Sequence, residues 1–153
     1  MNANQTSTEA AAGKSAAKPF SRHIPTIVRV LMGLMFVVFG LNGFLNFIPQ
    51  PKTPMPEGAM AFAGALMKTG YMMPLVMGTQ LLVGILLLLN LFVPLALALI
   101  APILVGIITF HIFLQPAGLA PGAVILVMEL YLAWSYRQSF RPMLAMRATP
   151  GVK

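Results

Sequence analysis

Cysteine is absent from this chain of 153 residues, and charged residues make up only 8% of it. Without a thiol, the chain supplies no disulfide exchange, no thiolate metal site and no cysteine nucleophile. The P-loop, HExxH, GxSxG and GxGxxG motifs are also missing, so nucleotide and hydrolytic chemistry have no support in the sequence. Because no catalytic constellation is complete, we expect no enzymatic activity from this chain alone.

Hydrophobic residues, by contrast, make up 58% of the chain. Soluble domains contain about 25% charged residues, so this balance indicates a membrane protein. Spans of about 20 residues each leave room for three or four crossings and for no sizeable soluble domain. We predict one all-α domain over residues 23–140, an antiparallel bundle of four transmembrane helices. The apolar runs place its spans at residues 24–48, 72–92, 95–114 and 119–136.

The connection between the first two spans is the longest in this predicted bundle. Its first part contains four prolines, which exclude a regular helix: Pro49, Pro51, Pro54 and Pro56. After them, Ala59–Lys68 predicts a short helix that ends at Gly70 as a C-cap would. These residues are too few to span a bilayer, so we expect the helix to lie on the extracytoplasmic surface.

Basic residues lie mostly toward the two ends of the chain. Eight of the ten lysines and arginines are found there: Lys14, Lys18, Arg22, Arg29, Arg137, Arg141, Arg147 and Lys153. Only Lys52 and Lys68 lie in the long connection. The positive-inside rule therefore places both termini in the cytoplasm, in a multi-pass protein of the cell membrane. The net charge of +7 fits an anionic membrane surface better than nucleic acid.

Both terminal segments are polar. Residues 1–22 show no cleavage site of a signal peptide, so we expect a disordered cytoplasmic tail that stays attached to the first span. Residues 141–153 are expected to form a basic cytoplasmic segment.

Three glycines fall on one stripe of the first span when each residue advances by about 100° around the helix. The stripe consists of Arg29, Gly33, Phe36, Gly40, Gly43 and Phe47. It predicts a face that another helix approaches closely. In the third span, Pro102 predicts a kink.

Six polar side chains within the predicted spans are candidates for a site in the membrane. Asn42, Asn46, Gln80 and His111 belong to the outer half of the membrane, whereas Glu129 lies deeper and Arg29 lies toward the cytoplasm. Polar residues in lipid turn toward protein or water. Asn42, Asn46, Gln80, His111 and Glu129 are therefore candidates for a polar cavity or a quinone site, and hydrogen bonding between helices is the alternative for the asparagines.

Two of these side chains leave several interpretations open. Glu129 pairs with Arg29 as an intramembrane ion pair, or stays protonated, with or without a role in a proton or quinone site. His111 binds Gln80, Gln115 or a backbone carbonyl, contacts a quinone, relays protons, or ligates a metal.

Methionines raise a separate possibility, a Cu(I) site on the outer side. The candidates are Met55, Met60, Met67, Met72, Met73 and Met77. Their spacing is irregular, and methionine also fills gaps in apolar packing, so we assign no metal ligands.

Several segments in this order resemble the DoxX family of small four-helix membrane proteins. They are GLNGFLNFIP, TGYMMP, PLALALIAPILVGIITFHIFLQPAG and LAWSYRQSFRPML, within Ile24–Leu144. The resemblance implies a four-span bundle in the cytoplasmic membrane and a role beside enzymes of quinone-linked oxidation or oxidative stress. Two positions depart from the pattern, because Gln80 stands where many relatives have glutamate and Gly106 where relatives often have asparagine. Both changes make the interior less polar.

Three hypotheses of different classes remain. In the first, the chain is an auxiliary subunit of a membrane redox system, with His111, Gln80 and Asn42 contacting a quinone or a partner's cofactor. In the second, it is a scaffolding subunit of a larger membrane complex and has no chemistry of its own. A transporter is the least supported, because the four short spans show neither an inverted repeat nor a pair of broken helices.

Overall fold

The computed structural model describes residues 23–49 and 54–144 and contains helices but no strand within these ranges. The long helices are α1 (Ile24–Leu45), α3 (Met72–Leu88), α4 (Val93–Phe113) and α5 (Leu119–Ser135). The short elements are α2 (Glu57–Lys68), the 3-10 turn η2 (Pro116–Gly118) and α6 (Arg137–Phe140). The all-helical fold class is therefore confirmed. The predicted tail of residues 1–22 and residues 145–153 of the basic segment lie outside the described ranges.

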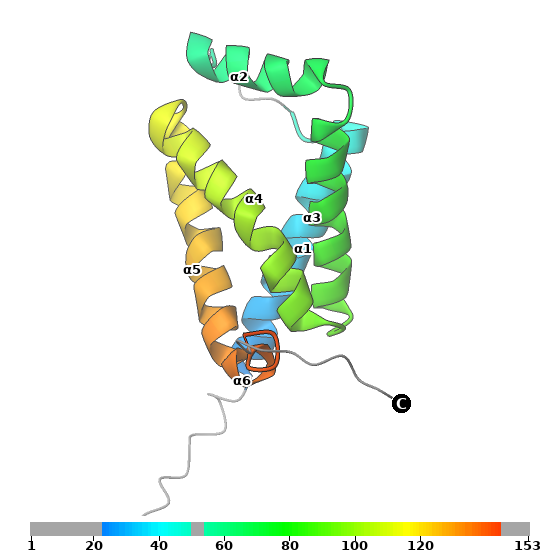
Figure 1. Cartoon of the computed structure of the whole chain (residues 1–153). Coiled ribbons are helices and arrows are strands. Elements are labelled where there is room, and N and C mark those ends of the chain that lie inside the picture. Colours follow the sequence, from blue (N-terminus) through cyan, green and yellow to red (C-terminus); the bar gives the residue numbers. More distant parts are fainter. Residues whose placement is uncertain (1–22, 50–53, 145–153) are drawn as a thin grey trace, which may run out of the picture.

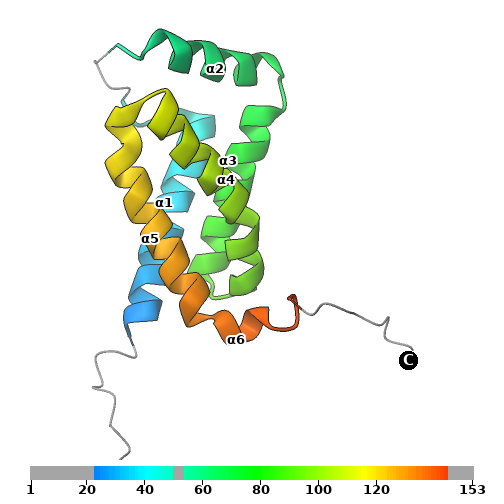
Figure 2. The same ribbon diagram turned by 60° about the vertical axis from the view of Figure 1, so that its left-hand side comes forward.

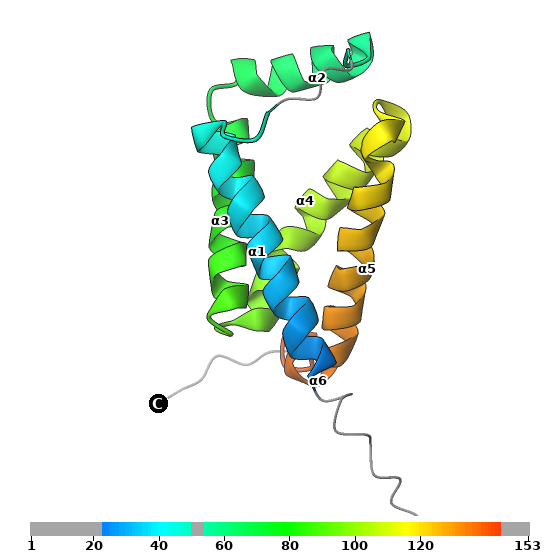
Figure 3. The same cartoon turned by 180° about the vertical axis from the view of Figure 1, so that it is seen from behind.

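The four long helices run side by side, and α2 lies across one end of them (Figure 1). At the opposite end, where α1 begins, α6 continues from α5 and turns across the end of the bundle, as the turned views in Figure 2 and Figure 3 also show. α1 packs against α3 and α5, and α4 packs against the same two helices. Each long helix therefore has two long neighbours, and the four enclose one core.

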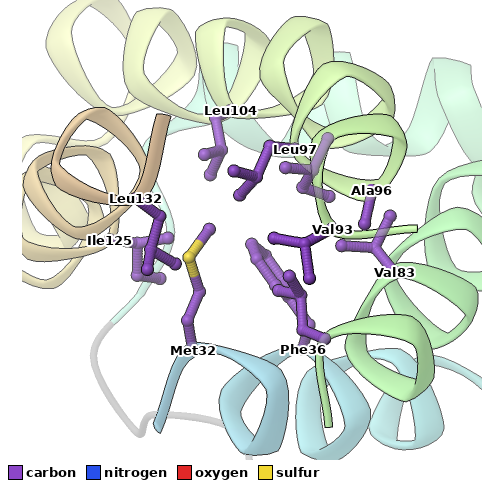
Figure 4. Packing of buried hydrophobic residues seen from close by; sticks show 11 residues of the cluster. Met32, Phe36, Val83, Val93, Ala96, Leu97, Leu104, Ile125 and Leu132 are labelled. Atoms are coloured by element: carbon purple, nitrogen blue, oxygen red, sulfur yellow. The ribbon is translucent and has the colours of Figure 1, made fainter. Parts of the chain in front are cut away.

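Apolar side chains from all four long helices fill this core (Figure 4). Met32 and Phe36 extend from α1 toward Leu97 of α4 and Leu132 of α5, and all four are almost completely buried. Most of the surface of the long helices is also apolar, with large exposed side chains such as Val127. A helix that is apolar on every side suits a lipid environment.

Three helical segments are long and apolar enough to cross a membrane: Ile24–Leu45, Val93–Phe113 and Pro116–Ser135. Their mean hydropathies are 2.2, 2.5 and 1.6. α3 has 17 residues and passes the same test only together with α2, from which it is bent by 89°. By length and composition, the described residues thus provide three candidate spans, or up to four if this bent pair counts as one.

α1 ends at Leu45, earlier than the predicted boundary at residue 48. Asn46 adopts a left-handed conformation, with φ of 49° and ψ of 42°. Asparagine tolerates this conformation better than other residues with a side chain, so it ends the helix although the sequence around it stays apolar.

α3 likewise ends at Leu88 rather than at the predicted residue 92. Asn90 has a φ of 57°, and the amide of Leu91 donates to the carbonyl of Leu86 at 2.9 Å. The amide of Asn90 also donates to Leu87 at 3.2 Å. This is the Schellman pattern, with asparagine in the place that glycine usually takes. α4 then starts at Val93, two residues before the predicted start.

The remaining short segments agree with the sequence in kind but differ in extent. α2 starts at Glu57 rather than Ala59, and Gly70 follows it with a φ of 75°, as its predicted role as a helix terminator requires.

The glycine stripe of α1 packs against α3, as predicted. A Cβ added at Gly40 would lie 2.8 Å from the backbone nitrogen of Leu81, and one added at Gly84 would lie 2.7 Å from that of Val37. Because backbone atoms cannot move aside independently, only glycine permits this approach.

Candidate functional site

Asn42 and Asn46 take part in the hydrogen bonds that cap the C-terminus of α1. The amide of Ile48 donates to Oδ1 of Asn42 at 2.7 Å, and the amide of Asn46 donates to the carbonyl of Asn42 at 2.8 Å. The side chain of Asn46 is exposed. The carboxamide oxygen of Asn42 therefore serves its own connection rather than a neighbouring helix.

His111 has a comparable role at the end of α4. Its Nδ1 donates to the carbonyl of Gln115 at 2.9 Å, which requires a proton on that nitrogen. The ring lies against Gly118, where any added Cβ would collide with it. One of the expected partners of His111, a backbone carbonyl, is thus its observed partner.

Gln80 lies on the buried face of α3 and is only 6% exposed. Within residues 23–49 and 54–144, no hydrogen bond joins it to Asn42 or His111. The predicted outer-half candidates are therefore not connected to one another by hydrogen bonds in the described part of the chain.

Arg29 is buried in the second turn of α1. Its Nη1 donates to the carbonyl of Leu87 and lies 3.4 Å from the carbonyl of Leu88. These carbonyls belong to the last turn of α3, where a cation is favoured by unsatisfied carbonyls and by the helix dipole. Nε of Arg29 has no hydrogen-bond partner among the described residues.

Glu129 is 6% exposed and lies less than two turns before the end of α5. The start of α1 and the end of α5 lie at the same end of the bundle (Figure 3), and Arg29 and Glu129 each belong to the half of their helix that is nearer to this end. Oε2 of Glu129 also has no hydrogen-bond partner among the described residues. The ion pair between them therefore stays a prediction.

A cleft of about 330 Å³ lies where α2 meets the far end of α4. It is lined by Phe62, Gly106, Thr109, Phe110, Phe113 and Leu114. The rings of Phe62 and Phe110 lie 5.7 Å apart at 36°. Volumes of about 300–1,000 Å³ are usual for small-molecule sites, so this open cleft lies at the small end of that range.

The lining of this cleft is almost wholly apolar. The hydroxyl of Thr109 donates back to the carbonyl of Val105 at 2.8 Å and lies 3.0 Å from that of Gly106. Gly106 leaves open space, because an added Cβ would meet no atom within 4 Å. The cleft thus suits a flat apolar group rather than a charged one.

The candidates predicted from the sequence do not line this cleft, although His111 lies directly beside it. Its ring meets the ring of Phe110 edge-on, with 5.3 Å between the centroids. The sequence could not reveal the cleft, because Phe62 and Phe110 are far apart in the chain and meet only when α2 folds over α4.

The described residues contain no group of three or more His, Cys, Asp or Glu side chains placed to hold a metal ion. A second hollow of about 440 Å³ follows α2 from Glu57 to Lys68. Since only α2 lines it, we base no site on it.

Comparison with known proteins gives one result. No curated protein and no solved structure matches the chain. The model of the DoxX family matches residues 24–112, which is more than half of the chain and includes α1, α2, α3 and almost all of α4. Glu129 and α6 lie beyond the matched residues. By this match, the chain belongs to the DoxX family of membrane proteins.

Proposed function

We propose that α1, α3, α4 and α5 each cross the membrane, with α2 on the extracytoplasmic surface and both termini in the cytoplasm. The side-by-side packing of the four long helices supports this arrangement, and 17 residues are at the short end of the usual range for a span. The excess of lysine and arginine toward the chain ends supports the orientation.

Within this arrangement, the protein serves as an auxiliary subunit of a quinone-linked redox system in the cell membrane. The main support for this function is the cleft between α2 and α4, next to the rings of Phe62 and Phe110. A quinone is a flat ring on an apolar tail, so its ring can stack on an aromatic side chain of the lining while its tail stays in lipid. Because the chain has no cysteine, we assign electron transfer to a partner enzyme.

His111 borders the cleft in this proposal. With Nδ1 donating to Gln115, the neutral imidazole keeps an acceptor lone pair on Nε2. That nitrogen lies against Gly118 rather than in the lining of the cleft, so the ring acts on the ligand only by supporting Phe110, which it meets edge-on. The chain therefore binds and orients the ligand and leaves its oxidation to the partner.

Binding of a short-chain quinone to the purified protein in lipid nanodiscs tests this function. We expect saturable binding by the native chain and at least a tenfold loss in Gly106→Leu, which fills the cleft. Gly78→Leu is the matched control, because Gly78 is also open to an added Cβ but lies on α3 outside the lining. A native chain that binds no quinone, or equal binding by both variants, would contradict the proposal.

The scaffolding function is the second candidate, and one observation favours it. Asn42 and His111 bind the turns that follow their own helices, so their polarity needs no ligand to explain it. If a tagged chain copurifies with a membrane complex and Gly106→Leu leaves that complex intact without quinone binding, scaffolding is the better description.

A further inference from the structure

The short segment after α5 presents two different faces. Tyr136 and Phe140 are one helical turn apart and pack against the core. Arg137 and Arg141 are also one turn apart, and both are exposed. The aromatic face therefore fixes α6 on the bundle, while the neighbouring basic face stays accessible.

Arg137 is held in place by the end of α5. Its guanidinium carbon lies 4.6 Å from the ring centroid of Trp134, and its Nη1 donates to the carbonyl of Trp134 at 3.1 Å. A cation over an indole ring is attracted by the π system. The guanidinium is thus oriented before any ligand arrives.

The charge of this surface has no counter-ion in the described part of the chain. The sequence contains three acidic residues: Glu9, Glu57 and Glu129. Glu57 begins α2 at the opposite end of the bundle, Glu129 is buried, and Glu9 lies outside the described ranges. A negative group that neutralises Arg137 and Arg141 therefore has to come from outside the described residues.

The apolar side chains next to the arginines indicate which kind of molecule supplies this negative group. Trp134 is 64% exposed, Met143 is 55% exposed and Leu144 is 76% exposed. Indole rings and apolar side chains next to arginine are typical of the membrane interface. A free anion in water would leave these side chains uncovered, whereas a lipid covers them.

We propose that Arg137 and Arg141, oriented by Trp134, bind the phosphate of an anionic phospholipid in the leaflet next to α6. The guanidinium donors fit phosphate oxygens in a forked geometry. The acyl chains of the same lipid cover Trp134, Met143 and Leu144. This site lies at the end of the bundle opposite the cleft and is independent of quinone binding.

Trp134 allows a direct test, because it is the only tryptophan in the chain. The purified protein is reconstituted in phosphatidylcholine vesicles that contain a minor fraction of brominated lipid, which quenches nearby indole fluorescence. In one series the brominated lipid is phosphatidylglycerol, and in the other it is phosphatidylcholine. We expect stronger quenching by brominated phosphatidylglycerol at equal content, which gives a preference ratio for each variant.

Two variants make the test specific. In the double variant Arg137→Gln/Arg141→Gln we expect the preference for phosphatidylglycerol to fall. Each lost arginine should lower the preference ratio by about fivefold, until the two lipids quench equally. Lys68→Gln is the control, because Lys68 is exposed in the last turn of α2, at the other end of the bundle, and its ratio should equal that of the native chain. Comparing ratios corrects for any change in fluorescence that the loss of Arg137 causes.

Three outcomes would overturn the proposal. The first is equal quenching by both lipids in the native chain, and the second is a preference that survives in the double variant. The third is loss of the preference on adding millimolar inorganic phosphate, since the site would then take a free anion rather than a lipid.

Discussion

At the scale of single residues, hydrogen bonding of polar groups in the apolar helices is mostly local. Asn42 binds the turn after α1 and His111 binds the turn after α4. Helical spacing identifies the face on which a side chain lies, but it cannot tell whether its partner is a neighbouring helix or the next turn. For this reason the sequence left the partners of these polar residues open.

Arg29 and Glu129 are the exceptions, because each keeps a buried polar atom without a partner among the described residues. We expect them to interact, and a double-mutant cycle of Arg29→Gln and Glu129→Gln should give a coupling energy of about 1–3 kcal/mol. The physical reason is that an unpaired charge is costly away from water. The free energy of unfolding in mixed micelles measures each corner of the cycle.

Glu129→Gln combined with Lys68→Gln is the control cycle, since these residues lie toward opposite ends of the bundle. It should be additive within about 0.5 kcal/mol. If the effects of Arg29→Gln and Glu129→Gln on the free energy of unfolding add in the same way, the ion pair does not form.

At the scale of the helices, the apolar runs predicted where each long helix lies but not where it ends. The errors at α1 and α3 share one cause, the left-handed Asn46 and Asn90. Both asparagines lie in apolar surroundings, so the hydropathy pattern continues past the true ends. The cleft was not predicted either, because it depends on how α2 folds over α4.

Replacing Asn90 tests its role as a helix terminator. Asn90→Ala should lower the free energy of unfolding by about 1 kcal/mol, because alanine is strained in the left-handed region. Asn90→Gly should change it by less than about 0.5 kcal/mol, because glycine has no such strain. A larger loss in Asn90→Gly than in Asn90→Ala would mean that the carboxamide, rather than the backbone conformation, matters.

Close packing of α1 on α3 gives a second prediction at this scale. Gly84→Ala should destabilise the bundle by about 1–3 kcal/mol, because its Cβ would press on the backbone of Val37. On the same helix, Gly78 faces open space, so Gly78→Ala should be neutral or stabilising by up to about 1 kcal/mol. Thermal unfolding in detergent compares the two, and an equal effect would argue against the tight contact.

At the scale of the whole molecule, the proposed four-span topology requires that the short α3 crosses the membrane. The absence of cysteine is useful here, because an introduced thiol is the only one in the chain. Lys68 and Leu91 are both exposed and lie on either side of α3, just outside its two ends. Their accessibility from the two sides of the membrane therefore reports on α3 directly.

We expect a membrane-impermeant maleimide to label Lys68→Cys in intact cells, whereas Leu91→Cys reacts only after permeabilisation. This follows from the proposed orientation, in which α3 carries the chain from the outer to the cytoplasmic side. Labelling of both variants in intact cells would mean that α3 does not cross and that the protein has fewer than four spans.

The contact between α1 and α5 also bears on how the bundle is assembled. α1 is the first long helix to be synthesised and α5 the last, yet they are neighbours. α1 and α3 can pair through their glycine faces as soon as both are inserted. The carboxyl group of Glu129, by contrast, belongs to the last long helix, so docking of α5 onto the bundle is the event that buries this costly side chain.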